Sequence, residues 1–174
     1  MPSVNPQDGQ EIKNLVDAVD RASGVVNPKT AQKSWDTIAV LLSEVANRFD
    51  KYKSLVGSIK GPNLVTLSGV VEDLTKLDNA TQDLEAWLQK LIQNLPGNEK
   101  ITWGIRLDKL GKMRKKMALK DTLAAIYRYS EYIQLDQESK KKLSHRQQSP
   151  YHDDKAIIVT AINQISGDLR RLSK

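Results

Sequence analysis

Residues 63–95 constrain the fold most, because they carry an apolar side chain every three or four positions without a slip. This spacing predicts a helix about 45 Å long with one apolar stripe. Thr81 is the polar exception, so a break there into two shorter helices is the alternative. The stripe can pack inside a bundle or serve as an oligomer seam, and both remain open at this stage. Its apolar members are Leu67, Val70, Leu74, Leu77, Leu84, Leu88, Leu91 and Leu95.

The same spacing recurs along the rest of the chain. Residues 10–22, 30–60 and 153–172 each carry one apolar stripe, and no segment shows the alternation of a strand bounded by turn residues. We therefore predict an all-α fold, an up-and-down helical bundle of about five or six helices with long heptad-patterned helices. Residues 1–174 are expected to form a single domain. The last stripe reaches "LRRLSK" with no Gly or Pro stop, so a domain excised from a longer protein is an open alternative.

Residues 101–143 hold two apolar stripes that are offset from each other. The offset predicts a bend or a change of packing partner near residues 116–120. The polar segment "SHRQQSPYHDD" follows and contains Pro150, which predicts a loop over residues 144–153. Asp153 or Asp154 is then expected to cap the last helix.

The positive charge of the chain is concentrated in one short segment. The chain has 27 basic and 21 acidic residues, a net charge of +6. Residues 106–120 account for the whole excess, because they hold one acid, Asp108, and seven basic residues. These are Arg106, Lys109, Lys112, Arg114, Lys115, Lys116 and Lys120. Helical periodicity puts the lysines opposite an apolar stripe of leucines and methionines, whereas Arg114 falls over that stripe.

Such a face either solvates the outside of a bundle or binds an external anion. Lys112, Lys116 and Lys120 follow one another at i, i+4, where like charges repel. An anionic membrane surface attracts each nearby lysine by about 1 kcal/mol. Nucleic acid is less favoured, because residues 105–120 contain no aromatic side chain on which bases could stack. We expect an interaction domain that contacts an anionic membrane or an acidic partner, with an oligomeric scaffold as the alternative.

The sequence offers little for catalysis. It has no cysteine, no glycine-rich phosphate loop, and only two histidines, His145 and His152, without a ligand pattern around them. We therefore expect no enzyme activity, cofactor, metal or small-molecule substrate. The start "MPSVNPQDGQ" has no basic segment followed by an apolar one, and residues 38–42 are the longest apolar run. These features favour a cytoplasmic protein, with peripheral attachment to a membrane as the alternative location.

Residues 101–135, "ITWGIRLDKLGKMRKKMALKDTLAAIYRYSEYIQL", combine a tryptophan, a basic amphipathic segment and a Leu/Ile-rich stretch. In this outline the segment resembles the fungal HeLo and HeLo-like domains, which are N-terminal helical domains of NLR-like (STAND) and prion-controlled cell-death proteins. The resemblance implies a signalling or cell-death module that engages membranes when it oligomerises. Members of that family commonly open with an apolar helix, and "MPSVNPQDGQ" does not, which leaves surface attachment or assembly.

Overall fold

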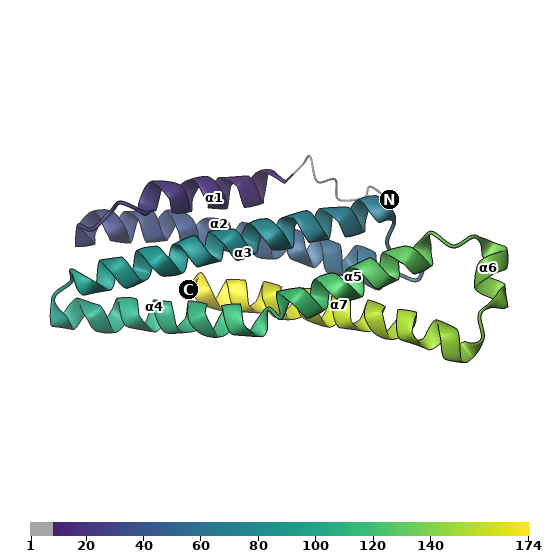
Figure 1. The fold of residues 1–174 in the computed structure, drawn as a ribbon. Coiled ribbons are helices and arrows are strands. Elements are labelled where there is room, and N and C mark those ends of the chain that lie inside the picture. The colour runs from purple at the N-terminus through teal and green to yellow at the C-terminus, as the bar shows by residue number, and fades with distance from the viewer. Residues whose placement is uncertain (1–8) are drawn as a thin grey trace.

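The structure, a computed structural model, describes residues 9–174 apart from the side chains of Gln137, His145 and Ser149. The described chain is helical, with short turns between helices and no strand, which confirms the all-α prediction (Figure 1). The helices are α1 (Gln10–Ala22), α2 (Pro28–Gly57), α3 (Leu64–Gln93), α4 (Gly97–Lys116), α5 (Leu119–Ile133), α6 (Gln137–Lys142) and α7 (His145–Leu172).

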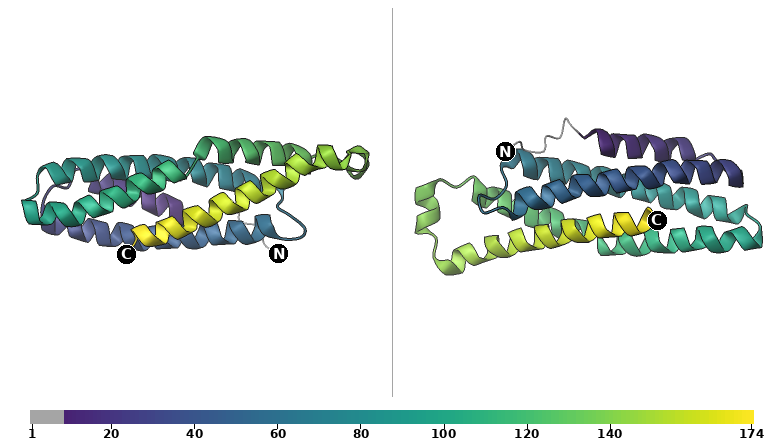
Figure 2. Two further views of the ribbon diagram at one scale, coloured as in Figure 1. Left: turned by 90° about the horizontal axis from the view of Figure 1, so that it is seen from below. Right: turned by 180° about the vertical axis from the view of Figure 1, so that it is seen from behind.

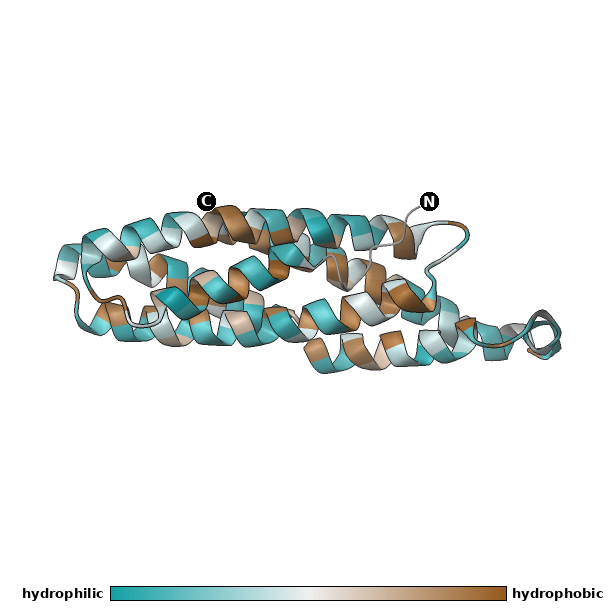
Figure 3. Ribbon diagram, turned by 90° about the horizontal axis from the view of Figure 1, so that it is seen from above, coloured by the Kyte–Doolittle hydropathy of each residue, from teal (hydrophilic) through white to brown (hydrophobic). Residues whose placement is uncertain are grey.

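The helices form an elongated up-and-down bundle, as predicted (Figures 1 and 2). α2 and α3 run in opposite directions. α4 and α5 follow one another beside α3, and α7 returns beside them. α1 packs on both α2 and α3, while α7 contacts α2, α4 and α5. Each long helix carries both hydrophilic and hydrophobic residues around its circumference in Figure 3, as amphipathic helices do.

Short polar side chains fix where the long helices begin. The Asn27 side chain accepts hydrogen bonds from the backbone N–H groups of Lys29 and Thr30 at the start of α2. Asn63 accepts one from Thr66 at the start of α3. These side chains satisfy N–H groups that have no partner inside the helix, so each cap stabilises its helix by about 1 kcal/mol.

The apolar stripe of α3 lies inside the bundle. Its seven members on α3, and Leu95 just after the helix, are each at most 5% exposed within the single chain. These side chains pack within the single chain, where α1, α2, α4 and α5 contact α3, so an oligomer seam on them stays a prediction. α3 is also one helix rather than two, since the Thr81 hydroxyl donates a hydrogen bond to the Leu77 carbonyl (2.9 Å) and needs no break in the helix.

The loop predicted for residues 144–153 is instead the beginning of α7. The Ser144 hydroxyl accepts a hydrogen bond from the Gln147 N–H, and the Gln147 side chain accepts one from the Ser144 N–H. This reciprocal capping box starts the helix nine residues before the predicted cap. The helix continues through Pro150, although proline has no N–H to donate to the carbonyl four residues earlier. Asp154, expected as a possible cap, is buried and accepts hydrogen bonds from Nε and Nη2 of the Arg128 guanidinium, which joins α5 to α7.

Residues 101–143 form α4, α5 and the short α6 rather than one helix. The break falls at Met117 and Ala118, inside the predicted region of 116–120. Ala118 adopts a left-handed backbone conformation with φ of 43°, which ends one helix and redirects the chain into the next. Lys120 therefore lies on α5, so the predicted i, i+4 series of lysines ends at Lys116.

A buried ion pair joins the three N-terminal helices. The Arg48 guanidinium of α2 donates to the Asp73 carboxylate of α3, and both side chains are at most 4% exposed. The Tyr52 hydroxyl donates to the same carboxylate at 2.7 Å. Burial, followed by the charge of Asp73, raises the pKa of Tyr52, so this hydroxyl stays protonated. Glu11 of α1 lies 3.6 Å from the same guanidinium.

Within residues 9–174, no helix combines the length and the apolar character needed to cross a bilayer.

Candidate functional site: the outer face of α4

α4 exposes most of the predicted basic residues on its outer side. Lys109, Lys112, Lys115 and Lys116 are exposed on α4, and Lys120 is exposed at the start of α5. We call these five residues the lysine face. α4 turns its other side inward, where Trp103, Leu110 and Met113 are buried against the bundle. For the four lysines on α4, the outward orientation agrees with the helical periodicity of the sequence, whereas Lys120 lies beyond the break on α5.

Neighbouring helices do not neutralise the lysine face. Lys112 forms an ion pair with Asp108 one turn earlier (2.9 Å), and both side chains are more than 60% exposed. Such an exposed pair contributes about 0.3–0.5 kcal/mol and leaves the lysine accessible. The other four lysines have no carboxylate oxygen within 4 Å among the described residues. Most of the positive charge of this face is thus available to an external anion.

Arg106 does not belong to the candidate site, although the sequence placed it there. Its guanidinium lies over the rings of Trp103 and Trp35, 4.4 and 4.9 Å from their centroids, and donates to Gln32 (3.0 Å). Burial lowers its pKa from the ordinary arginine value, and the Asp36 carboxylate partly offsets that effect. Arg106 therefore helps to hold α4 against the buried tryptophans at this end of the bundle.

Arg114 is also excluded from the candidate site. Its guanidinium donates to the Glu85 carboxylate of α3 at 3.1 Å and lies 3.6 Å from that of Asp78. The position over the apolar stripe, recognised from the sequence, points this side chain toward α3 rather than toward solvent. The charge of Arg114 is therefore compensated by these two carboxylates, and the contact holds α4 against α3.

Two isoleucines extend the lysine face toward the start of α4. Ile101 and Ile105 are 68% and 52% exposed. Ile101, Ile105 and Lys109 are spaced four residues apart, so they lie on the same side of the helix. The sequence analysis did not identify this pair. The signal was present, because both isoleucines fall on the face predicted to be polar.

The lysine face borders a groove against the end of α7. The groove has a volume of about 240 Å³ and lies between α4 and the C-terminal turns of α7, which run side by side in Figure 2. Lys109, Lys112 and Lys116 line it from α4. Arg171 and Lys174 line the other wall, where Arg171 pairs with Asp168. This groove therefore concentrates cations from two helices around one small volume.

Histidines and carboxylates are the remaining side chains to consider among the described residues. Within that part of the chain, the structure brings together no group of three or more His, Asp or Glu side chains that could hold a metal ion. His152 lies edge-on to the Tyr132 ring, with 6.2 Å between the ring centroids. The side chain of His145 lies outside the described part.

A scan of the chain against models of protein families finds no match, and searches of the curated proteins and of the solved structures find no match either. Fold and surface together define an all-α helical bundle with a basic and partly apolar exposed helix face. The resemblance of residues 101–135 to HeLo domains stays a prediction.

Proposed function

We propose that this chain is a non-enzymatic interaction domain that attaches to anionic membrane surfaces through the outer face of α4. The observation that carries the proposal is the combination of exposed isoleucines and exposed lysines on one side of α4, whose opposite side is buried in the bundle. Each lysine near an anionic membrane contributes about 1 kcal/mol of attraction. The isoleucines can enter the boundary between headgroups and acyl chains.

The mode of attachment follows from how α4 is packed. Its apolar stripe is buried in the bundle, so α4 cannot lay that stripe into a bilayer without opening the fold. The bundle would instead rest on the membrane as a rigid body, held by electrostatic attraction and by Ile101 and Ile105. We extend this proposal to a role in signalling or defence on the resemblance to HeLo domains alone.

Flotation with lipid vesicles tests the proposal. The wild-type chain is expected to float with vesicles that contain phosphatidylserine and to stay behind with purely neutral ones. Replacing Lys109, Lys112 and Lys116 by Glu should weaken binding by about a hundredfold or more, since three attractive charges become repulsive. The matched control replaces Lys13, Lys33 and Lys51 by Glu, because these lysines are exposed on α1 and α2 and the net charge changes equally.

The isoleucine pair has its own test. Changing Ile101 and Ile105 to Ser should weaken flotation while leaving its salt dependence unchanged, because the lysines remain. Val40→Ser with Val65→Ser is the control, since these valines are 60% and 49% exposed on other helices. Wild-type protein that floats with neither vesicle type would overturn the membrane proposal. Binding to an acidic protein through the same face would then be the next candidate to examine.

A further inference from the structure

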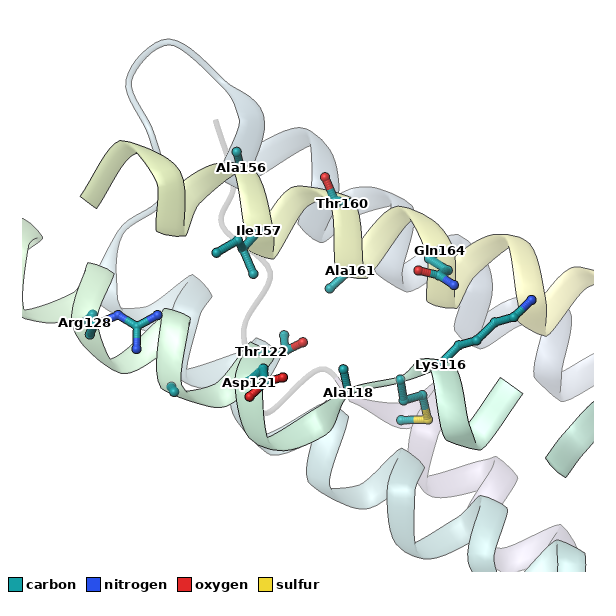
Figure 4. A pocket seen from close by; sticks show the side chains of 12 residues that line it. Lys116, Ala118, Asp121, Thr122, Arg128, Ala156, Ile157, Thr160, Ala161 and Gln164 are labelled. Carbon is teal, nitrogen blue, oxygen red and sulfur yellow. The ribbon is translucent and has the colours of Figure 1, made fainter. Parts of the chain in front are cut away.

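A second groove continues from the lysine face along α7. It has a volume of about 670 Å³ and lies between α5 and α7. Half of its lining residues are apolar, four of them alanines, and the polar half includes Lys116, Asp121 and Arg128. Figure 4 shows Ile157 and Ala161 of α7 across the gap from Thr122 of α5 and Ala118 of the α4–α5 junction. Ligand pockets in proteins commonly have volumes of about 300–1,000 Å³ and mostly apolar walls.

The break at Ala118 explains why this groove is open. The left-handed residue ends α4 and starts α5 in a new direction, so α7 packs on two helices that are not collinear. Ile157 and Ala161 of α7 point into the gap toward α5 in Figure 4, while Ala156 and Thr160, both exposed, line the groove from the same helix. No larger side chain from the described residues fills the volume between the two helices.

Lys116 lines both grooves and therefore marks where they meet. On one side of Lys116, toward the middle of α7, lies the larger groove between α5 and α7. We call it the alanine-lined groove, after Ala118, Ala124, Ala156 and Ala161. On the other side lies the smaller groove between α4 and the end of α7, which we call the cationic groove. Five basic side chains and one carboxylate, that of Asp168, line it. In Figure 4, Lys116 lies at the end of the alanine-lined groove nearest the C-terminal half of α7. One elongated molecule could occupy both grooves if one of its ends were anionic and the rest apolar.

We infer that the two grooves together bind a single anionic lipid, with its phosphate among Lys109, Lys112 and Lys116 and an acyl chain between α5 and α7. The inference rests on the proposed function, since the lipid would enter from the membrane that the lysine face contacts. Charge decides against a second copy of the chain as the occupant. Each copy carries a net charge of +6 and would bring further cations to a groove that already ends in cations.

Titration calorimetry without vesicles tests the inference. The probe is oleoyl lysophosphatidic acid, kept below its micelle concentration and added to the full chain. Lysophosphatidylcholine supplies the same chain with a neutral headgroup, and inorganic phosphate supplies the charge without the chain. Lysophosphatidic acid is expected to bind about tenfold or more tightly than either comparison ligand, because it alone satisfies both grooves.

Two kinds of variant separate this site from membrane attachment. Ala161→Trp fills the alanine-lined groove and should abolish binding of lysophosphatidic acid without affecting flotation on phosphatidylserine vesicles. Ala156→Trp, at an exposed position of the same wall, gives a second version if the first does not fold. Ala86→Trp is the control, since Ala86 is exposed on α3 and lines neither groove. For charge, Lys116→Glu should weaken lipid binding by about tenfold or more, whereas Lys120→Glu should not.

The two proposals fail in different ways. If the wild type floats but binds lysophosphatidic acid no better than phosphate or lysophosphatidylcholine, the lipid site is overturned and membrane attachment stands. If lysophosphatidic acid binds while flotation fails, the attachment proposal is overturned. Sedimentation that shows a dimer dissolved by Ala161→Trp would mean that a second copy occupies the groove, which also overturns the lipid site.

Discussion

Ala118 is held in a left-handed conformation that alanine seldom adopts, with φ of 43°. This conformation costs an L-residue about 1–2 kcal/mol, and glycine avoids that cost. Glycine also loses more entropy on folding, so part of the gain is cancelled. We expect Ala118→Gly to stabilise the protein by about 0.5–1 kcal/mol and to raise the melting temperature by about 1–4 °C in a calorimetric scan.

Ala86→Gly provides the comparison for Ala118→Gly. Ala86 lies exposed in the middle of α3, in ordinary helical conformation, so glycine there should lower stability by about 0.5–1 kcal/mol. Opposite signs at the two alanines would identify the backbone conformation as the cause. A lower melting temperature for both variants would contradict the left-handed assignment of Ala118.

Individual side chains of the candidate site were only partly predictable from the sequence. The lysines were predicted to face outward, because helical periodicity decides that without knowledge of neighbouring helices. The partners of Arg114 could not be predicted, since Glu85 and Asp78 come from a helix about 30 residues earlier in the chain. The Lys112 and Asp108 pair lies within one helix and could have been found from its i, i+4 spacing.

At the scale of elements, a partly exposed ion pair between α2 and α7 provides a dependence on pH. Arg170 of α7 donates to the Asp50 carboxylate of α2 at 2.5 Å, and the Ser166 hydroxyl donates to its other oxygen at 2.6 Å. Burial raises the pKa of Asp50, but these hydrogen bonds outweigh burial, so the pKa lies below its ordinary value. Asp50 therefore stabilises the fold above about pH 4, and that contribution is lost as the pH falls through the lowered pKa.

Asp50→Asn should remove this contribution. We expect melting temperatures measured between pH 6 and pH 2 to fall less steeply for the variant than for the wild type. The difference should shrink in high salt, because the Asp50 side chain is 40% exposed. Parallel curves for the two proteins in low salt would show that the hydrogen bonds to Asp50 contribute nothing to the acid sensitivity.

The helices differ in how well the sequence specified their ends. α2 and α3 were predictable, because Asn-Pro or Pro-Asn stands next to a long unbroken stripe at each start. The start of α7 was missed because Pro150 and the surrounding polar residues outweighed the Ser144 and Gln147 signature. The break between α4 and α5 was predicted only as a region. No glycine marks it, and the left-handed residue is an alanine.

At the scale of the whole molecule, a substitution in the α3 stripe tests whether these side chains pack within one chain or between chains. Leu88 is fully buried within the chain. Leu88→Ala should lower the free energy of unfolding by about 2–5 kcal/mol in urea titrations, through lost burial and a cavity. The mass in sedimentation equilibrium should stay that of the wild type. A change in mass with little loss of stability would indicate an oligomer seam on the stripe.

The location of the excess charge was predictable for the molecule as a whole, but the grooves were not. Seven basic residues within residues 106–120 directed attention to α4 from the sequence alone. The two grooves along α7 depend on how α4, α5 and α7 diverge, and residues such as Lys116 and Ala161 are 45 positions apart in the chain. Nothing in local periodicity links such distant positions.

The buried pair of Arg48 and Asp73 has a consequence for how the chain folds during synthesis. α1 and α2 emerge from the ribosome before Asp73 does. The Arg48 guanidinium of α2 can therefore reach its buried position beside the Asp73 carboxylate only after the first turns of α3 have formed. The N-terminal hairpin should therefore stay protease-sensitive on a nascent chain that ends before residue 73. Protection should appear abruptly once α3 is available.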